Sequence, residues 1–147
     1  MNPDFVGLLR ALSEADARFL IVGAYAVTFH SRPRATGDLD IWVESTPGNA
    51  ARVMHALRAF GAPLQDLKAD DFATPGVVYQ IGVPPRRIGL LTSLTGLTFD
   101  EAWAGRIVGP FGDLECPFIG RGELVRNKRA LGRPRDLADL EMLGESG

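Results

Sequence analysis

Asp38 and Asp40 are the residues of this chain best suited to metal chemistry. They lie in the segment RATGDLDIWV, residues 34–43, where polar and apolar residues alternate after Gly37. Such alternation predicts a strand, on which side chains two residues apart face the same side at a spacing of roughly 7 Å. Two carboxylates so placed repel each other unless a cation lies between them, and Mg²⁺ prefers oxygen ligands. The alternative, two solvent-facing strand residues, is disfavoured because aspartate is depleted in strands.

A candidate phosphate-binding turn precedes the aspartate pair. The apolar run at residues 19–22 predicts a buried strand that ends at Gly23, and residues 24–30 predict a short helix. A glycine at such a turn lets backbone N–H groups approach a phosphate, and the N-terminus of a helix favours an anion. Arg34 and Thr36 could add a cationic and a hydroxyl contact. A glycine turn alone is more often purely structural, and the aspartates that follow are what favour phosphate binding here.

The other elements predict a sheet with helices packed on it. Further helices are expected at residues 2–17, 47–60, 99–104, 121–131 and 135–143, and further strands at 38–44, 77–83, 87–92, 106–108 and 114–119. Residues 62–75 are expected to form a loop. Strands mixed with helices favour an α/β or α+β fold, with a mixed sheet of about five strands and a C-terminal helical pair. Residues 1–147 are expected to form a single domain.

Composition excludes several classes of protein. The 147 residues are 46% hydrophobic and 23% charged with a net charge of −2, which is typical of a globular protein without a broad DNA-binding surface. No apolar run approaches the ~20 residues of a membrane span. The lone Cys116 excludes an internal disulfide and suits a reducing cytoplasm. His30 and His55 are too few for a zinc site. The basic residues of the segment 121–135 form either a solvated helix face or an anion contact.

Several of these segments together resemble the DNA polymerase beta-like nucleotidyltransferase superfamily. The segments GAYAV (residues 23–27) and RATGDLD (residues 34–40) are similar to its active-site signature. The segment RIGLLT (residues 87–92), Lys128 and the segment RPRDLADL (residues 133–140) are also similar to that group, so the resemblance covers most of the chain. The small bacterial stand-alone members look closest, which include minimal nucleotidyltransferases and the proteins of toxin–antitoxin pairs.

The resemblance implies a reaction and a set of site residues. A nucleoside triphosphate would bind with Mg²⁺ or Mn²⁺ on Asp38 and Asp40. An acceptor hydroxyl on a protein, an RNA or a small molecule would attack the α-phosphorus, and pyrophosphate would leave. The nucleotide would contact the glycine turn, the segment before the aspartates and the basic helix: Gly23, Ala24, Tyr25, Arg34, Thr36 and Lys128. Lys128 is the candidate for a triphosphate contact, although a lone lysine is more often a surface residue.

Two positions depart from the family pattern. Ala24 stands where Gly or Ser is usual, and Gly89 stands where the family places a third metal-binding acid. Help from a general base is typically worth about 10²–10⁴-fold, so its loss would leave a nucleotide-binding module or an antitoxin with little transferase activity. An acid from elsewhere could substitute: Asp70, Asp71, Asp100 or Glu101. Asp136 and Asp139 either belong to the helical motif of the family or simply favour the first turn of a helix.

Overall fold

The computed structural model describes residues 2–32 and 37–145, which contain seven helices and six strands. The helices are α1 (Pro3–Glu14), α2 (Gly23–His30), α3 (Pro47–Phe60), α4 (Ala69–Phe72), α5 (Phe99–Ala104), α6 (Arg121–Leu131) and α7 (Pro134–Met142). The strands are β1 (Phe19–Val22), β2 (Leu39–Val43), β3 (Val78–Ile81), β4 (Ile88–Leu91), β5 (Ile107–Phe111) and β6 (Leu114–Phe118).

The strands form one mixed sheet in the order β3-β4-β2-β1-β6-β5. Strand β2 is parallel to β4 and antiparallel to β1, and β1 is parallel to β6. The antiparallel hairpins β3–β4 and β5–β6 complete the two edges. The central position of β1 and β2 explains their apolar composition, because both faces of such strands are covered.

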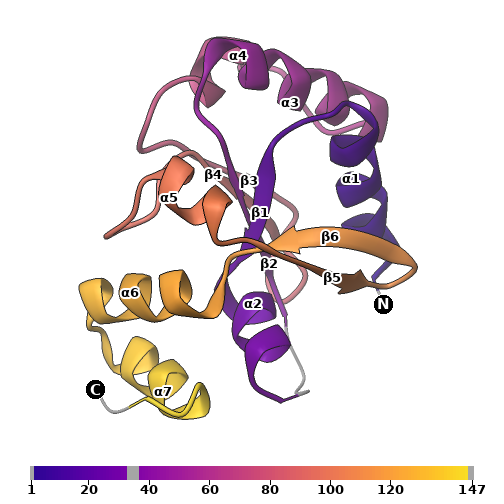
Figure 1. Cartoon of the computed structure of the whole chain (residues 1–147). Helices are drawn as coiled ribbons and strands as arrows, with labels where there is room; N and C mark the ends of the chain where they lie inside the picture. The colour runs from indigo at the N-terminus through magenta and orange to yellow at the C-terminus, as the bar shows by residue number, and fades with distance from the viewer. Residues whose placement is uncertain (1, 33–36, 146–147) are drawn as a thin grey trace.

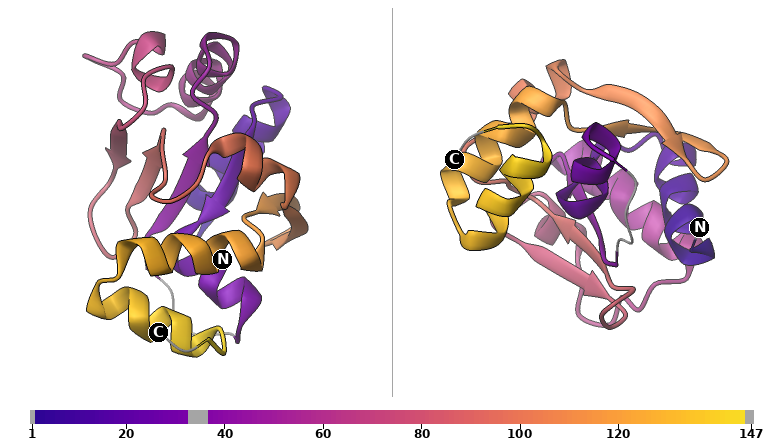
Figure 2. Two further views of the ribbon diagram at one scale, coloured as in Figure 1. Left: turned by 60° about the vertical axis from the view of Figure 1, so that its left-hand side comes forward. Right: turned by 90° about the horizontal axis from the view of Figure 1, so that it is seen from below.

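The two faces of the sheet pack against different helices. Leu39, Ile41 and Val43 of β2 join the larger apolar cluster, which includes residues of α1, α3 and α4. Trp42 points to the other face and joins a second cluster with residues of α2, α5, α6 and α7. Figures 1 and 2 show α1 and α3 at one end of the sheet and the pair α6–α7 at the other. Since side chains alternate along a strand, Asp40 shares the face of Trp42, on the side of α6 and α7.

Helix boundaries follow the capping residues in the sequence. The Asn2 side chain accepts a hydrogen bond from the backbone N–H of Asp4 at 2.8 Å and so caps α1. Thr46 caps α3, with Pro47 in the first turn. Gly61 ends α3 in the left-handed conformation with a φ of 89°.

The structure corrects several predicted boundaries. Helix α1 ends at Glu14 rather than near residue 17, because Asp16 has a positive φ of 60° that stops the helix. Among the described residues the sheet has six strands rather than about five. Strand β5 extends to Phe111, because the whole of β5 pairs with β6. The expected loop at residues 62–75 contains the short helix α4, whose buried Phe72 packs on the larger core.

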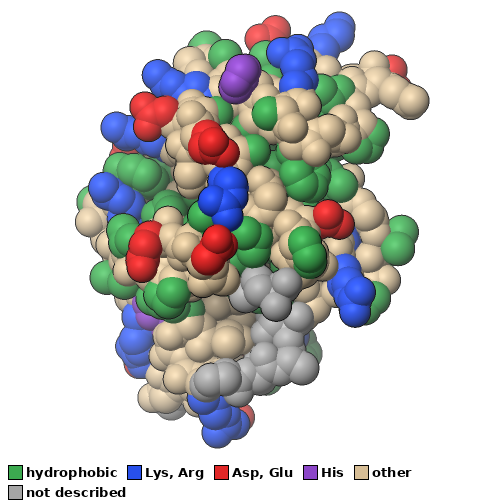
Figure 3. All heavy atoms as spheres, turned by 90° about the vertical axis from the view of Figure 1, so that its right-hand side faces the viewer, with side chains coloured by type: hydrophobic (Ala, Val, Ile, Leu, Met, Phe, Trp, Pro, Cys, Tyr) green, Lys and Arg blue, Asp and Glu red, His purple; other side chains and the backbone are tan. Residues whose placement is uncertain are grey.

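The helices and the surface give two further observations. No helix within residues 2–32 and 37–145 is long and apolar enough to cross a membrane. Figure 3 shows basic and acidic side chains interspersed with apolar ones on the face that it presents. That face therefore carries no large patch of a single charge.

Candidate active site

Pairing between the strands places the carboxylate of Asp40 at the centre of the candidate site. Asp40 is opposite Val22 of β1 on one side and opposite Gly89 of β4 on the other. Residues directly opposite each other on neighbouring strands project to the same face of the sheet. The space around the carboxylate is therefore set by the residue at position 89 and by the turn that follows Val22.

Both of these neighbouring positions are glycines that make room for the carboxylate. A Cβ atom added to Gly23 would lie 2.6 Å from Oδ2 of Asp40, and one added to Gly89 would lie 2.9 Å from Oδ1. Gly23 also has a φ of 66°, a conformation that residues with a side chain rarely adopt. The glycine at position 23 is therefore explained by the local structure, whether or not a phosphate binds there.

Asp38 lies directly before β2 and is held by Arg87. The backbone N–H of Arg87 donates to Oδ1 of Asp38 at 2.9 Å, and the Arg87 guanidinium lies 3.3 Å from Oδ2. Arg87 itself comes directly before β4, so two adjacent parallel strands position the contact. The two aspartates are therefore fixed at neighbouring points at the start of one strand.

The electrostatic surroundings of Asp40 favour a bound cation. Burial raises the pKa of the Asp40 carboxyl group, and the negative charge of Asp38 raises it further. Arg87, Lys128 and Arg135 act in the opposite direction without cancelling the increase. A carboxylate that is costly to ionise beside a second carboxylate gains most from a divalent cation, which stabilises both charges.

Helices α6 and α7 contribute a network of buried charges. Lys128 of α6 is buried, and its Nζ lies 3.4 Å from Oδ1 of Asp136 and 3.0 Å from Oδ2 of Asp139. Asp136 is fully buried and accepts hydrogen bonds from the backbone N–H and the guanidinium of Arg133. Bonds from Arg133 are the main cause that lowers the pKa of Asp136 to about 2, so this carboxylate stays ionised at neutral pH.

The aspartates and the helical charges line one pocket of about 350 Å³. Its described lining residues are Gly23, Ala24, Asp38, Asp40, Arg87, Lys128, Arg133, Arg135 and Asp139. The acids at one side could hold a divalent cation, and the cationic side chains at the other could contact phosphate oxygens. A polyphosphate with a bound metal ion therefore matches the charges of this pocket.

Comparison with solved structures identifies the fold. The crystal structure of a candidate nucleotidyltransferase from Thermotoga maritima matches with a TM-score of 0.62 over 96% of this chain and 92% of that chain, at 9% identity. The chain has the nucleotidyltransferase fold. The lincosamide antibiotic adenylyltransferase LnuA, in its lincomycin-bound form, matches with a TM-score of 0.61 over 98% of this chain and 96% of that chain, at 11% identity. No protein-family model and no curated protein sequence matches the chain.

Most of the predicted site residues that the structure describes meet in this pocket of the nucleotidyltransferase fold. Asp38, Asp40, Gly23, Ala24 and Lys128 all line it. The predicted contacts Arg34 and Thr36 lie outside the described residues.

The ring of Tyr25 points elsewhere. It packs against the rings of Phe5 and Phe111, with centroids 5.9 and 5.2 Å away. The side chain of Tyr25 therefore belongs to the larger core, and a backbone N–H in the first turn of α2 is what this residue could offer a phosphate.

Three arginines of the pocket are absent from the prediction. Arg87 lies in the segment that resembles the family, and Arg133 and Arg135 lie in the basic C-terminal segment. Their charge was visible in the sequence, but their approach to the aspartates depends on the pairing of β2 with β4 and on the turn between α6 and α7.

No third acid joins the aspartate pair within the described ranges. They contain no group of three or more His, Cys, Asp or Glu residues that could hold a metal ion. The possible substitutes Asp70, Asp71, Asp100 and Glu101 lie on α4 and α5 and do not line the pocket. Two of them have other roles, since Asp71 accepts from the backbone N–H of Lys68 and Glu101 pairs with Arg126. Gly89 faces Asp40 at the position where the family resemblance places the third carboxylate.

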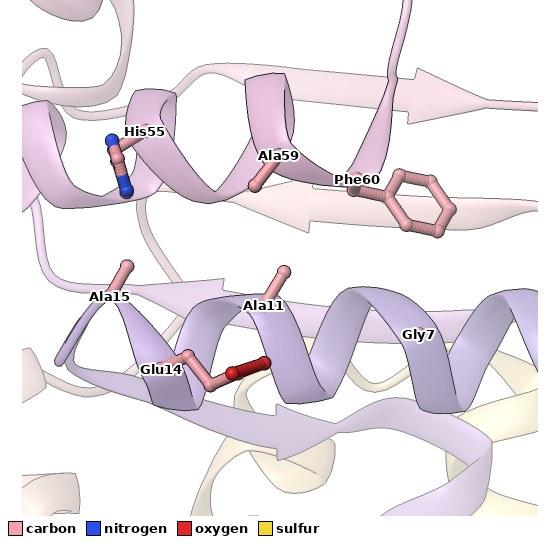
Figure 4. Close-up of a pocket in the computed structure, with 7 residues that line it drawn as sticks. All are labelled: Gly7, Ala11, Glu14, Ala15, His55, Ala59 and Phe60. Atoms are coloured by element: carbon pink, nitrogen blue, oxygen red, sulfur yellow. The ribbon is translucent and has the colours of Figure 1, made fainter.

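A second pocket of about 450 Å³ lies between α1 and α3, on the helices that cover the opposite face of the sheet. Figure 4 shows that its walls are mainly small side chains, with His55 of α3 and Glu14 of α1 at one end. The described residues of its lining include no cluster of cations and no pair of acids. This larger pocket thus lacks the chemistry that a metal–nucleotide complex requires.

Proposed function

We propose that the protein binds a nucleoside triphosphate with Mg²⁺ or Mn²⁺ and transfers the nucleoside monophosphate group to an acceptor hydroxyl. The observation that carries this proposal is the single pocket that joins Asp38 and Asp40 to Lys128. The nucleotidyltransferase fold supports it, because the two solved structures that share the fold are described as a nucleotidyltransferase and an adenylyltransferase.

The residues of the pocket fit a divalent cation. Two carboxylates face one space, and burial raises the pKa of one of them, Asp40. The metal, when bound, would offset charge on the phosphate oxygens. Asp38 and Asp40 would hold it, and the glycines beside Asp40 would keep that carboxylate in place.

The remaining groups of the pocket would hold the triphosphate. Lys128 and Arg133 would contact phosphate oxygens from the helical side, and the first turn of α2 would offer backbone N–H groups. In the transfer step the acceptor oxygen would form a bond to the α-phosphorus. The bond from the α-phosphorus to the bridging oxygen would break, and its electron pair would leave with pyrophosphate. The proton of the hydroxyl would pass to solvent.

The acceptor belongs to one of three classes: a small molecule, an RNA or a protein. The structural neighbour LnuA is a lincosamide adenylyltransferase with bound lincomycin, which supports testing small hydroxyl-bearing molecules first. A protein acceptor would include a toxin or antitoxin partner.

Gly89 supports one second candidate function. Because this residue offers no carboxylate opposite Asp40, a protein that binds a metal–nucleotide complex or a protein partner without catalysis would have the same pocket. A nucleotide-binding module and an antitoxin are two forms of this alternative.

One assay separates the two candidates. Each radiolabelled nucleoside triphosphate is incubated with Mg²⁺ and with small-molecule, RNA or protein acceptors, using wild-type protein and the variant Asp40→Asn. The proposal predicts label on at least one acceptor with wild type and none with the variant. Nucleotide binding by calorimetry without transfer to any acceptor would favour the binding protein. Absence of both binding and transfer would contradict the transferase and the nucleotide-binding module, and would leave only a protein that binds a protein partner.

A further inference from the structure

The ammonium group of Lys128 is shared by two acids of α7 that differ in exposure. The side chain of Asp136 is fully buried, whereas that of Asp139 is 17% exposed and lines the pocket. Lys128 is itself only 9% exposed at its side chain and also lines the pocket. An anion that enters the pocket therefore meets Lys128 together with Asp139, while Asp136 lies behind them.

Asp136 is bonded on several sides within the protein. Arg133 donates to it from Nε at 2.6 Å, from its guanidinium terminus at 3.2 Å and from its backbone N–H at 3.1 Å. Lys128 lies within 3.4 Å of the same carboxylate. A buried carboxylate with these partners fixes the positions of two cationic side chains that both line the pocket.

Asp139 has a different relation to the pocket. Its Oδ2 lies 3.0 Å from Nζ of Lys128, which is the distance at which a phosphate oxygen would bind the same ammonium group. The negative charges of a phosphate and of Asp139 on one ammonium group repel each other, so a phosphate bound to Lys128 disfavours the pair that Lys128 forms with Asp139. Because Asp136 stays bonded to Lys128, the exchange does not leave a buried cation unpaired.

We propose that Asp136 is a positioning residue that directs Lys128 and Arg133 into the pocket, and that Asp139 is an exchangeable partner of Lys128 that the triphosphate displaces. The inference rests on the proposed function, because it takes a polyphosphate to be the ligand of the pocket. Asp139 weakens the binding of the triphosphate in this arrangement and promotes the release of pyrophosphate, the product that carries the remaining phosphates.

The proposal predicts effects of opposite sign for two acids on one helix. Asp139→Asn should tighten binding about threefold to tenfold, because Lys128 loses a competing charge; tenfold is about 1.4 kcal/mol. Asp136→Asn should weaken binding about tenfold or more, because Lys128 and Arg133 lose the carboxylate that positions both of them. A simple effect of net charge would tighten binding in both variants, and a merely structural role would weaken it in both.

Calorimetry with a non-hydrolysable nucleoside triphosphate and Mg²⁺, and separately with inorganic tripolyphosphate, measures these effects. Glu141→Gln is the matched control, because it removes one negative charge from an exposed position of α7. It should leave both affinities unchanged, and Asp139→Glu should restore an affinity near that of wild type. Thermal unfolding shows whether each variant is folded.

The outcomes separate the inference from the function on which it rests. Effects of opposite sign support the inference, and effects of the same sign overturn it while leaving nucleotide binding established. If Asp136→Asn does not fold, Asp139→Asn decides alone: tighter binding supports the inference, and unchanged or weaker binding overturns it. If wild-type protein binds neither ligand, the proposed function and this inference both fail.

Discussion

On the strand side of the pocket two carboxylates lie together and Arg87 pairs with one of them, Asp38, whereas the helix side pairs each buried charge with an opposite one. The strand side consists of Gly23, Asp38, Asp40 and Arg87, and its geometry is set by backbone pairing, by Gly23 and by Gly89 opposite Asp40. The helix side consists of Lys128, Arg133, Asp136 and Asp139, and ion pairs set its geometry. The strand side therefore gains stability from an added cation. The charges of the helix side are already paired, and we expect Lys128 to exchange Asp139 for a ligand.

The largest expected effect comes from removing the acids of the strand side. The double variant Asp38→Asn and Asp40→Asn should lose Mg²⁺-dependent binding of a nucleoside triphosphate, because amides do not supply the negative charge that holds the metal. The fold should persist, since neither side chain belongs to the apolar core. Calorimetry with and without Mg²⁺ measures the binding, and unchanged Mg²⁺-dependent affinity in the double variant would refute the metal assignment.

A carboxylate added on the strand side should have the next largest effect. Gly89→Asp places an acid opposite Asp40, where the new Cβ would lie 2.9 Å from Oδ1 of Asp40 and that carboxylate would have to shift slightly. We expect tighter Mg²⁺ binding and, with a competent acceptor, transfer that is faster by about 10²–10⁴-fold. The same variant should unfold at a lower temperature without metal, because three acids then repel one another.

Gly89→Ala is the control for this gain, since it adds the Cβ without the charge. The rates of transfer by Gly89→Asp and by Gly89→Ala are measured under single-turnover conditions. Equal effects of Ala and Asp at position 89 would show that the missing carboxylate is not what limits the reaction.

Removing one charged side chain should change stability in opposite directions on the helix side and on the strand side. Lys128→Met should lower the free energy of unfolding by about 3 kcal/mol, because it removes one member of a buried ion pair. Asp40→Asn should raise the melting temperature of the metal-free protein, because it removes a buried charge beside Asp38. Urea unfolding measures the first effect and thermal unfolding the second, both without metal. A loss of stability in both variants would contradict the contrast between the strand side and the helix side.

Asp40 on the strand side and Asp136 on the helix side should make stability depend on pH in opposite directions. The pKa of Asp40 is raised in the folded protein, so the folded state binds more protons than the unfolded state just above the ordinary pKa of aspartate. Ionisation of Asp40 therefore lowers the free energy of unfolding as pH rises from the ordinary pKa of aspartate to the raised pKa of Asp40. The pKa of Asp136 is lowered to about 2, so its stabilising effect is present above the ordinary value of 3.8 and is lost as pH falls towards about 2. Asp40→Asn should abolish the first slope and leave the second.

The smallest of these effects is expected at the glycine turn. Gly23→Ala forces a side chain into a positive φ and against Oδ2 of Asp40, which should cost about 1–3 kcal/mol of stability. It should also weaken Mg²⁺-dependent nucleotide binding about tenfold, because the Asp40 carboxylate must move. Gly48→Ala is the control, since a Cβ at that helical position would meet no atom within 4 Å. Equal results for both variants would show that Gly23 does not shape the site.

The sequence predicts the strand side of the site better than the helix side. Alternation after Gly37 and the run at residues 19–22 are local signals, and they correctly place β1, β2 and the acid pair at the start of β2. The position of Gly89 opposite Asp40 agrees with the family resemblance because strand pairing preserves register.

The remaining features depend on contacts between residues far apart in the sequence. Nothing in the local pattern indicates that Tyr25 packs on Phe111, or that Arg87 holds Asp38. The basic segment also left open whether Lys128 is a surface residue. Its burial follows from the turn at Gly132, which brings α7 and its two acids back against α6.

The most direct test of the metal–nucleotide site is a crystal structure with a non-hydrolysable nucleoside triphosphate and Mn²⁺, whose anomalous scattering locates the metal. The account predicts Mn²⁺ bound by Asp38 and Asp40, with the triphosphate extending towards Lys128 and Lys128 separated from Asp139. Metal and nucleotide bound elsewhere, or a soaked crystal with the pocket unchanged and empty, would contradict it.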